Sequence, residues 1–172
     1  MKFSVFKLDR RRLIFGVLTF ICMVTIFCFS MDNSEKSSSK SGNVTKTIVE
    51  IVVDDYKELP AEKQFSIMDK AEHIVRKSAH FMIYTLLGFM ASCTVGRRRL
   101  WSIGSLGALI FSFLYACSDE IHQFFVPGRA CMFTDVFIDT SGAAVGIFCS
   151  VMCMCITARL VKKTEKSSNK NS

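Results

Sequence analysis

The sequence predicts an all-α integral membrane bundle of four transmembrane helices, with an amphipathic extracytoplasmic segment between helices one and two. Half of the 172 residues are hydrophobic, and the mean hydropathy of +0.32 is high for a soluble domain. The apolar residues form runs of at least 18 residues, long enough to approach the ~30 Å hydrocarbon thickness of a bilayer. The basic residues behind the net charge of +7 flank these runs and do not interleave with aromatics, so we expect no nucleic-acid partner.

The first element follows a short basic N-terminus. Residues 1–12 contain five Lys and Arg residues and lead into an uncharged apolar run over 13–30. A cleaved signal peptide also has this pattern, but Phe29, Ser30 and Met31 offer no small-residue cleavage site, so we favour an uncleaved helix. The Ser-, Lys- and Asn-rich stretch that follows, 32–42, is typical of a flexible linker.

Two amphipathic stretches complete the predicted extracytoplasmic segment over 32–77. Within 44–59 the apolar residues recur near helical spacing and leave Asp54 and Asp55 to face water. After Pro60, a good first-turn residue, the pattern repeats over 61–76. We therefore expect a surface helix and then an amphipathic lead-in to the next span.

The remaining spans are predicted at 78–95, 100–117 and 136–161. The first two are apolar runs joined by a tight basic turn of Gly96 and three arginines, and the last is interrupted only by Asp139 before Arg159. Residues 162–172 are basic and rich in Ser and Asn, which is typical of a disordered tail.

The distribution of charge predicts the orientation of the helices. The N-terminus, the arginine turn and the tail together hold 13 Lys and Arg residues against two acidic residues, whereas the other polar segments hold nine against 13. By the positive-inside rule both termini lie in the cytoplasm of a bacterial cell, and 32–77 and 118–135 are extracytoplasmic. The chain is then a multi-pass protein of the cytoplasmic membrane.

The eight cysteines predict neither a disulfide framework nor a cysteine metal site. Most of them lie inside apolar runs, where cysteine behaves as a small hydrophobic residue. Only Cys131 lies in a polar connection. No established metal-ligand spacing occurs in the sequence, so no resident metal is assigned and the cofactor is left unknown.

The predicted topology brings polar helix ends together near the outer face. We call this set the polar layer, and its members come from the second, third and fourth spans: Lys77, His80 and Tyr84; Asp119, Glu120 and Gln123; Asp135 and Asp139. Ionisable residues at membrane depth usually mark a working site. His122 and Arg129, in the connection between the last two spans, are further candidates.

Asp139 is the member that reaches deepest. It lies about 6 Å beyond Asp135 on the same helix face, and an aspartate at the bilayer centre costs about 2.5–3.5 kcal/mol. We expect a basic partner, either Lys77 or Arg129. Gly142 and Gly146 continue this face as GxxxG, which permits close approach of a neighbouring helix.

These residues resemble the VanZ-like membrane proteins, a family named for a teicoplanin resistance protein. The resemblance covers about 74–146, and it rests on Lys77-Ser-Ala-His80-Phe81, Tyr84, Asp119-Glu120-Ile-His122-Gln123, Pro127-Gly128-Arg129, Asp135, Asp139 and Gly142. It implies a small bacterial helical membrane protein with an envelope role, linked in some members to glycopeptide resistance. Family members often carry a glutamate before the tyrosine, where this chain has Ile83.

Two classes of function remain open. The first is a non-catalytic envelope protein in the lipid bilayer whose polar layer binds a lipid-linked cell-wall precursor, an anionic lipid or a glycopeptide, and so contributes to resistance. The second is an enzyme that modifies a lipid or cell-wall head group, with Asp119, Glu120 and His122 holding a divalent cation and His80 acting as acid or base. A small transporter is a third and weaker possibility, because the cytoplasmic halves of the spans look apolar.

Overall fold

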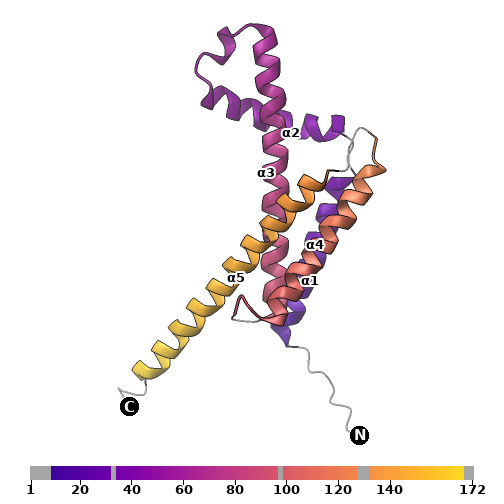
Figure 1. The fold of residues 1–172 in the computed structure, drawn as a ribbon. Helices are drawn as coiled ribbons and strands as arrows, with labels where there is room; N and C mark the ends of the chain where they lie inside the picture. The colour runs from indigo at the N-terminus through magenta and orange to yellow at the C-terminus, as the bar shows by residue number, and fades with distance from the viewer. Residues whose placement is uncertain (1–8, 32–33, 97–98, 128–131, 169–172) are drawn as a thin grey trace.

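The computed structural model describes residues 9–31, 34–96, 99–127 and 132–168, and these are α-helical almost throughout (Figure 1). The elements in chain order are α1 (Arg10–Ser30), α2 (Ser34–Val52), the short 3-10 helix η1 (Tyr56–Glu58), α3 (Ala61–Val95), α4 (Ile103–Phe124) and α5 (Phe133–Ser168). The described residues contain no strand, which confirms the all-α prediction.

α1, α3, α4 and α5 form the bundle, and the first turn of α1 lies at the same end of it as the last turns of α5 (Figure 1). α3 and α5 make the most extensive contact, α1 packs against α3, and α4 packs against α5. α3 extends beyond the bundle at the opposite end, where α2 crosses and contacts it (Figure 1). The short helix η1 lies in the connection between α2 and the first turn of α3.

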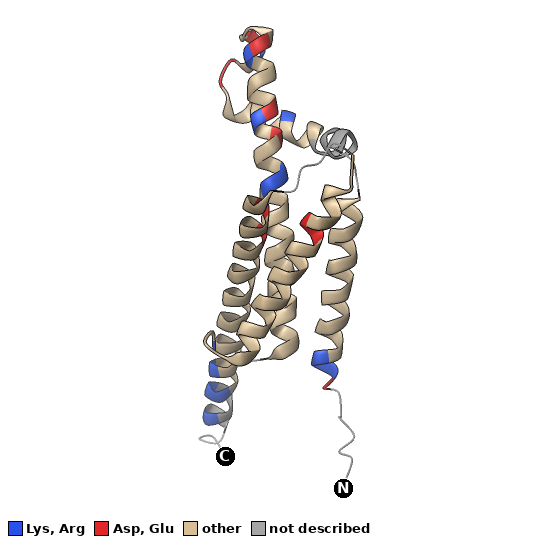
Figure 2. Ribbon diagram, turned by 45° about the vertical axis from the view of Figure 1, so that its right-hand side comes forward, with Lys and Arg blue, Asp and Glu red and all other residues tan. Residues whose placement is uncertain are grey.

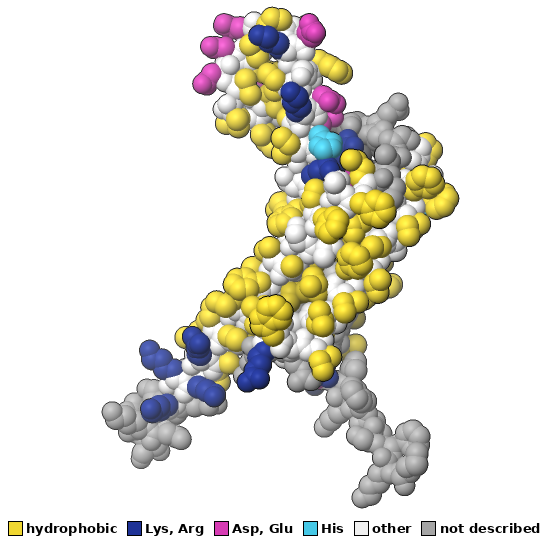
Figure 3. Space-filling model, in the orientation of Figure 1, with side chains coloured by type: hydrophobic (Ala, Val, Ile, Leu, Met, Phe, Trp, Pro, Cys, Tyr) yellow, Lys and Arg dark blue, Asp and Glu magenta, His cyan; other side chains and the backbone are white. Residues whose placement is uncertain are grey.

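Three of the helices are long and apolar enough to cross a membrane. They are α1, α3 and the part of α5 over Phe133–Lys163, and most side chains in their apolar windows are not buried inside the protein. Hydrophobic side chains cover much of the bundle face between its two charged ends (Figure 3). An apolar exterior of this extent indicates a membrane protein. α4, which carries Asp119 and Glu120 near its end, is not among the three, so four spans are not established.

Several helix boundaries differ from the sequence prediction. α2 begins at Ser34, inside the stretch expected to be a flexible linker, and α3 is continuous from Ala61 to Val95, where a lead-in and a separate span were expected. α4 lies later than predicted, and α5 extends to Ser168, into the tail expected to be disordered. Lys, Arg and Glu are good helix formers, so a helix that has nucleated continues through charged flanks where hydropathy no longer marks it.

The turn after α3 has the predicted glycine. Gly96 adopts a left-handed conformation with φ of 69°, which glycine tolerates without strain, and its N–H donates to the Ser92 carbonyl. Arg97 and Arg98 lie outside the described residues. α4 then begins with Ser102 as its N-cap, whose hydroxyl accepts from the N–H of Ser105.

Small residues set the distance between α3 and α5. A Cβ added to Gly88 of α3 would lie 2.7 Å from Cα of Ala143, and one added to Gly146 of α5 would lie 2.7 Å from the backbone N of Phe89. Gly142 faces the Phe81 carbonyl in the same way. The two backbones are therefore in direct contact, which is the kind of packing that small residues permit in lipid.

Candidate functional site

The mouth of the candidate site is an ion pair between α3 and α5. Lys77 Nζ lies 2.5 Å from Asp135 Oδ1, and the two side chains are 24% and 30% exposed. Thr134 donates a further hydrogen bond to the same carboxylate oxygen. Lys77 was expected as a partner of the deeper Asp139, but it forms its ion pair with Asp135 instead, because Asp135 lies nearer the end of α5 and level with Lys77.

Asp139 lies one turn deeper on α5 and is fully buried. Its Oδ1 atom lies 3.9 Å from Nδ1 of His80 on α3, within ion-pair range but too far for a hydrogen bond. Neither oxygen of the carboxylate has a hydrogen-bond partner among the described residues. This side chain is thus buried without the hydrogen bonds that buried carboxylates ordinarily make.

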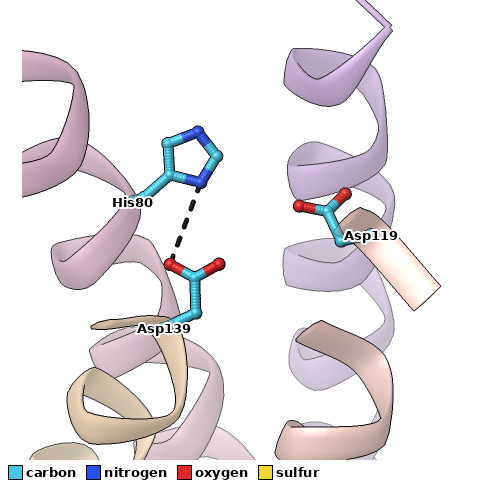
Figure 4. Close-up of side chains that lie close together, drawn as sticks. All are labelled: His80, Asp119 and Asp139. Carbon is cyan, nitrogen blue, oxygen red and sulfur yellow. Dashed lines mark ion pairs between the residues drawn. The ribbon is translucent and has the colours of Figure 1, made fainter. Parts of the chain in front are cut away.

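Asp119 faces the same point from α4. His80, Asp119 and Asp139 each place one nitrogen or oxygen atom so that the three atoms lie within 4.8 Å of one another. We call these three residues the His80 cluster. In Figure 4 the imidazole and the two carboxylates converge on the space between three helices. Asp119 and Asp139 are buried, and His80 is partly exposed.

Gln123 holds Asp119 in place. Its Nε2 atom donates to Asp119 Oδ2 at 3.0 Å and to the Ser30 hydroxyl, at the end of α1, at 3.3 Å. Tyr84 is fully buried one turn beyond His80, with Asp119 and Asp139 as electrostatic neighbours and the Tyr115 ring at 6.3 Å. Residues of α1, α3 and α4 therefore surround the buried side of the cluster.

Two sequence candidates are not part of the His80 cluster, although Glu120 is an electrostatic neighbour of Asp139. Glu120 is buried, and its carboxylate accepts a hydrogen bond of 3.0 Å from the backbone N–H of Met132. The His122 ring stacks on Phe27 of α1, with centroids 4.7 Å apart. The set proposed from the sequence for a cation, Asp119 with Glu120 and His122, is thus replaced by one drawn from three helices. Consecutive helix residues point in different directions, so Asp119 points into the cluster while the Glu120 carboxylate bonds to the Met132 N–H.

Sequence reasoning also missed two contributors. The Ser30 hydroxyl accepts a hydrogen bond from Gln123, and the Met132 backbone N–H donates to Glu120. Ser30 ends an uncharged run and Met132 contributes only its backbone, so no sequence pattern marks either residue. Arg129 and Gly128 lie outside the described residues. Ile83, where family members often carry a glutamate, packs against the apolar core that contains Cys22 and Ile26.

The glycines of α5 set the position of Asp139 against α3. Gly142 packs against the carbonyl of Phe81, the residue that follows His80 on α3. Gly146 packs against the carbonyl of Thr85, one turn further along α3. Larger residues at either position would push α5 away from α3 and separate Asp139 from His80. The GxxxG pattern therefore belongs to the same structural unit as the acidic residues.

The described cavities lie away from the polar layer. One of about 540 Å³ is lined by residues of α1, α3 and α5, including Arg11, Phe89 and Lys162, and another of about 330 Å³ lies between α1, α3 and α4. The partly exposed members of the polar layer include Lys77, Asp135 and His80, so a ligand would meet these side chains first.

The comparisons with known proteins decide the family. The family model described as VanZ/LLP1 matches residues 15–155, most of the chain. The chain belongs to the VanZ/LLP1 family. This confirms the resemblance noted in the sequence and extends it from the polar layer to α1 and most of α5. No curated protein and no solved structure gives a significant match.

Proposed function

We propose that this VanZ-family protein contributes to resistance against glycopeptide or other envelope-active antibiotics by binding a lipid-linked or cell-wall head group at its outer face. The observation that carries the proposal is the polar layer, in which Lys77 and Asp135 form a partly exposed mouth above the buried Asp139. A purely structural bundle would have no need for such groups between apolar helices. Family membership supports the link to antibiotic resistance.

The orientation is part of this proposal. Basic residues begin α1 and end α5, while the described acidic side chains other than Asp9 lie at the opposite end, in the bundle or beyond it (Figure 2). The positive-inside rule supports a cytoplasmic location for both termini and an outward-facing polar layer. Green fluorescent protein fused to the C-terminus is expected to fluoresce, and alkaline phosphatase fused after Lys57 is expected to be active. Inactive phosphatase at that position would contradict the orientation.

Four membrane spans are also part of the proposal. α4 has 22 residues, about 33 Å at the standard rise, which is enough to cross the hydrocarbon region. Leu106, Ile110 and Leu114 recur every four residues on it and are all about half exposed, which supports a lipid-facing stripe. α4 is antiparallel to both α3 and α5 in the bundle (Figure 1).

The chemistry of the mouth favours an anionic head group with hydrogen-bonding oxygens. The Lys77 ammonium has three donors, and Asp135 accepts one of them in the described contacts. A phosphate of a lipid-linked precursor or an anionic lipid, or a carboxylate of a glycopeptide, could take the others. Gln123 is buried and already donates to Asp119 and Ser30, so it would support the site without touching the ligand.

Expression in a susceptible bacterium tests the proposal. Teicoplanin and vancomycin susceptibility would be measured for cells with an empty vector, the wild-type protein, Lys77→Gln or Lys57→Gln. Lys57 is the matched control, because it is 75% exposed and pairs with Glu50 away from the polar layer. We expect protection from the wild type and Lys57→Gln, and loss of protection with Lys77→Gln at equal membrane abundance. Equal susceptibility of wild-type and empty-vector cells would refute the resistance role.

An enzyme acting on the same head group is the second candidate. The observation that favours it is the His80 cluster, where an imidazole lies beside two buried carboxylates, an arrangement suited to acid–base chemistry. Mass spectrometry of envelope lipids and cell-wall precursors would compare cells that express the wild type with cells that express Asp139→Asn. A modified species that appears only with the wild type would support catalysis, and identical spectra would exclude it for the molecules measured.

A further inference from the structure

We propose that His80, Asp119 and Asp139 bind one divalent cation between α3, α4 and α5. This inference does not rest on the proposed head-group function, because it concerns the buried cluster and not the mouth. Figure 4 shows the three side chains converging from three helices. Their ligand atoms lie within 4.8 Å of one another.

The state of Asp139 is the second observation. Its side chain is 1% exposed, and neither oxygen has a hydrogen-bond partner among the described residues. A carboxylate buried in this way costs several kcal/mol unless a positive charge or a proton compensates it. The nearest compensating atom in the described contacts is Nδ1 of His80, at 3.9 Å. A cation bound between the two would satisfy both oxygens of Asp139 without a change of fold.

The geometry is close to that of a bound metal. Metals bind imidazole nitrogen and carboxylate oxygen at about 2.0–2.2 Å, so neighbouring ligand atoms on a tetrahedral ion are about 3.4 Å apart. The His80–Asp139 separation exceeds this by about half an ångström, and no pair in the cluster exceeds 4.8 Å. Small rotations of the three side chains would complete the site.

The charges also balance. Two aspartates and a neutral imidazole carry −2, which one divalent ion neutralises. Of the neighbouring acids, Asp135 pairs with Lys77, and Glu120 accepts a hydrogen bond from the Met132 N–H and adds to the attraction for a cation at Asp139. Gln123 fixes Asp119 through Oδ2, as residues behind metal ligands typically do. Three protein ligands would leave coordination positions for water or a ligand oxygen.

Manganese is the appropriate probe. One nitrogen and two carboxylates suit Mn²⁺ or Zn²⁺, but thiolates bind zinc strongly, and the seven cysteines that the structure describes are all free. The full-length protein would be purified in detergent, stripped with a chelator and titrated with Mn²⁺, while electron paramagnetic resonance measures the free ion. We expect about one equivalent of Mn²⁺ per chain and displacement of that ion by Zn²⁺.

Matched variants connect binding to the cluster. Asp139→Asn is expected to lower Mn²⁺ affinity at least tenfold, and Gln123→Ala to lower it by about 10–100-fold. Asp69→Asn is the control, because it removes the same charge from an exposed position of α3, about 16 Å before His80 along the helix. It is expected to bind as the wild type does. His80→Gln provides a second ligand variant if Asp139→Asn fails to fold, and thermal unfolding of each variant reports on folding.

Three results would overturn the proposal. The first is no stoichiometric Mn²⁺ or Zn²⁺ binding by the wild type, which would leave a proton as the compensating charge. The second is equal affinity in the wild type, Asp139→Asn and His80→Gln. The third is Mn²⁺ binding only after Arg129→Gln, which would mean that a guanidinium balances the cluster. All three are measured without lipid or antibiotic, so failure of the resistance assay is a separate outcome.

Discussion

Replacement of Gly146 by alanine tests the contact that holds the candidate site together. The added Cβ would lie 2.7 Å from the backbone N of Phe89 and 2.9 Å from the carbonyl carbon of Thr85. Non-bonded heavy atoms prefer about 3.5–4.0 Å, so α5 would have to move about 1 Å away from α3. The obstructing atoms belong to the backbone and cannot rotate aside.

The expected loss of stability follows from two opposing effects. Overpacking costs about 1–3 kcal/mol, and backbone obstruction favours the upper part of that range. Alanine regains about 1 kcal/mol over glycine in helix propensity. The free energy of unfolding should therefore fall by about 1–2 kcal/mol. The shift also separates Asp139 from His80, so Mn²⁺ binding should weaken in the same variant.

Gly107→Ala is the matched control for this prediction. A Cβ at Gly107 on α4 meets nothing within 4 Å, so this variant should keep the propensity gain of up to about 1 kcal/mol. Unfolding of both variants in detergent micelles, followed by circular dichroism, measures the difference. If Gly146→Ala is as stable as Gly107→Ala, close approach of α3 and α5 is not what positions Asp139.

Three further substitutions have expected outcomes. Lys77→Met should lower the free energy of unfolding by about 1 kcal/mol, because the ion pair that it breaks with Asp135 is partly exposed. In a double-mutant cycle, the second substitution Asp135→Asn should recover most of this loss. Gln123→Ala should lower the free energy of unfolding by about 1–3 kcal/mol, because it removes a hydrogen-bond donor from the buried Asp119 carboxylate. Gln123→Glu should be at least as destabilising, because it places two carboxylates together. No loss of stability in either variant would mean that the hydrogen bond from Gln123 does not stabilise Asp119. Ser150→Ala breaks a buried hydrogen bond to Ser92 and should cost only about 0.6 kcal/mol, so a loss above 2 kcal/mol would point to a wider rearrangement.

The positions of the bundle helices could be predicted from the sequence, because the patterns that mark them are local. Long apolar runs and their basic flanks indicate where helices lie and which ends share a side. These signals end where hydropathy ends, so they missed the continuity of α3 through Arg76 and the start of α2 at Ser34. Hydrogen bonding along a helix continues through polar residues whose pattern does not mark them as helical.

The sequence predicted which residues belong to the candidate site, but it did not predict which of their side chains meet. Topology alone places polar ends of three helices at one level, and the spacing of Asp135 and Asp139 predicts that they share a face. Which residues meet depends on the rotation of each helix about its own axis. Gly88, Gly142 and Gly146 set that rotation for α3 and α5 through backbone contact. The selection of Asp119 over its neighbour Glu120 therefore required the structure.

The continuous length of α3 connects the segment beyond the bundle to the candidate site. The helix has 35 residues, about 52 Å, so about 20 Å of it extends beyond a 30 Å hydrocarbon layer. That extension carries α2 and η1, and no break separates it from Lys77 and His80 on the same rod. Because the helix is continuous, a force applied to α2 and η1 would be transmitted along α3 toward its glycine contact with α5. The segment beyond the bundle is thereby connected, through one helix, to the Lys77 ion pair and to the imidazole of the His80 cluster.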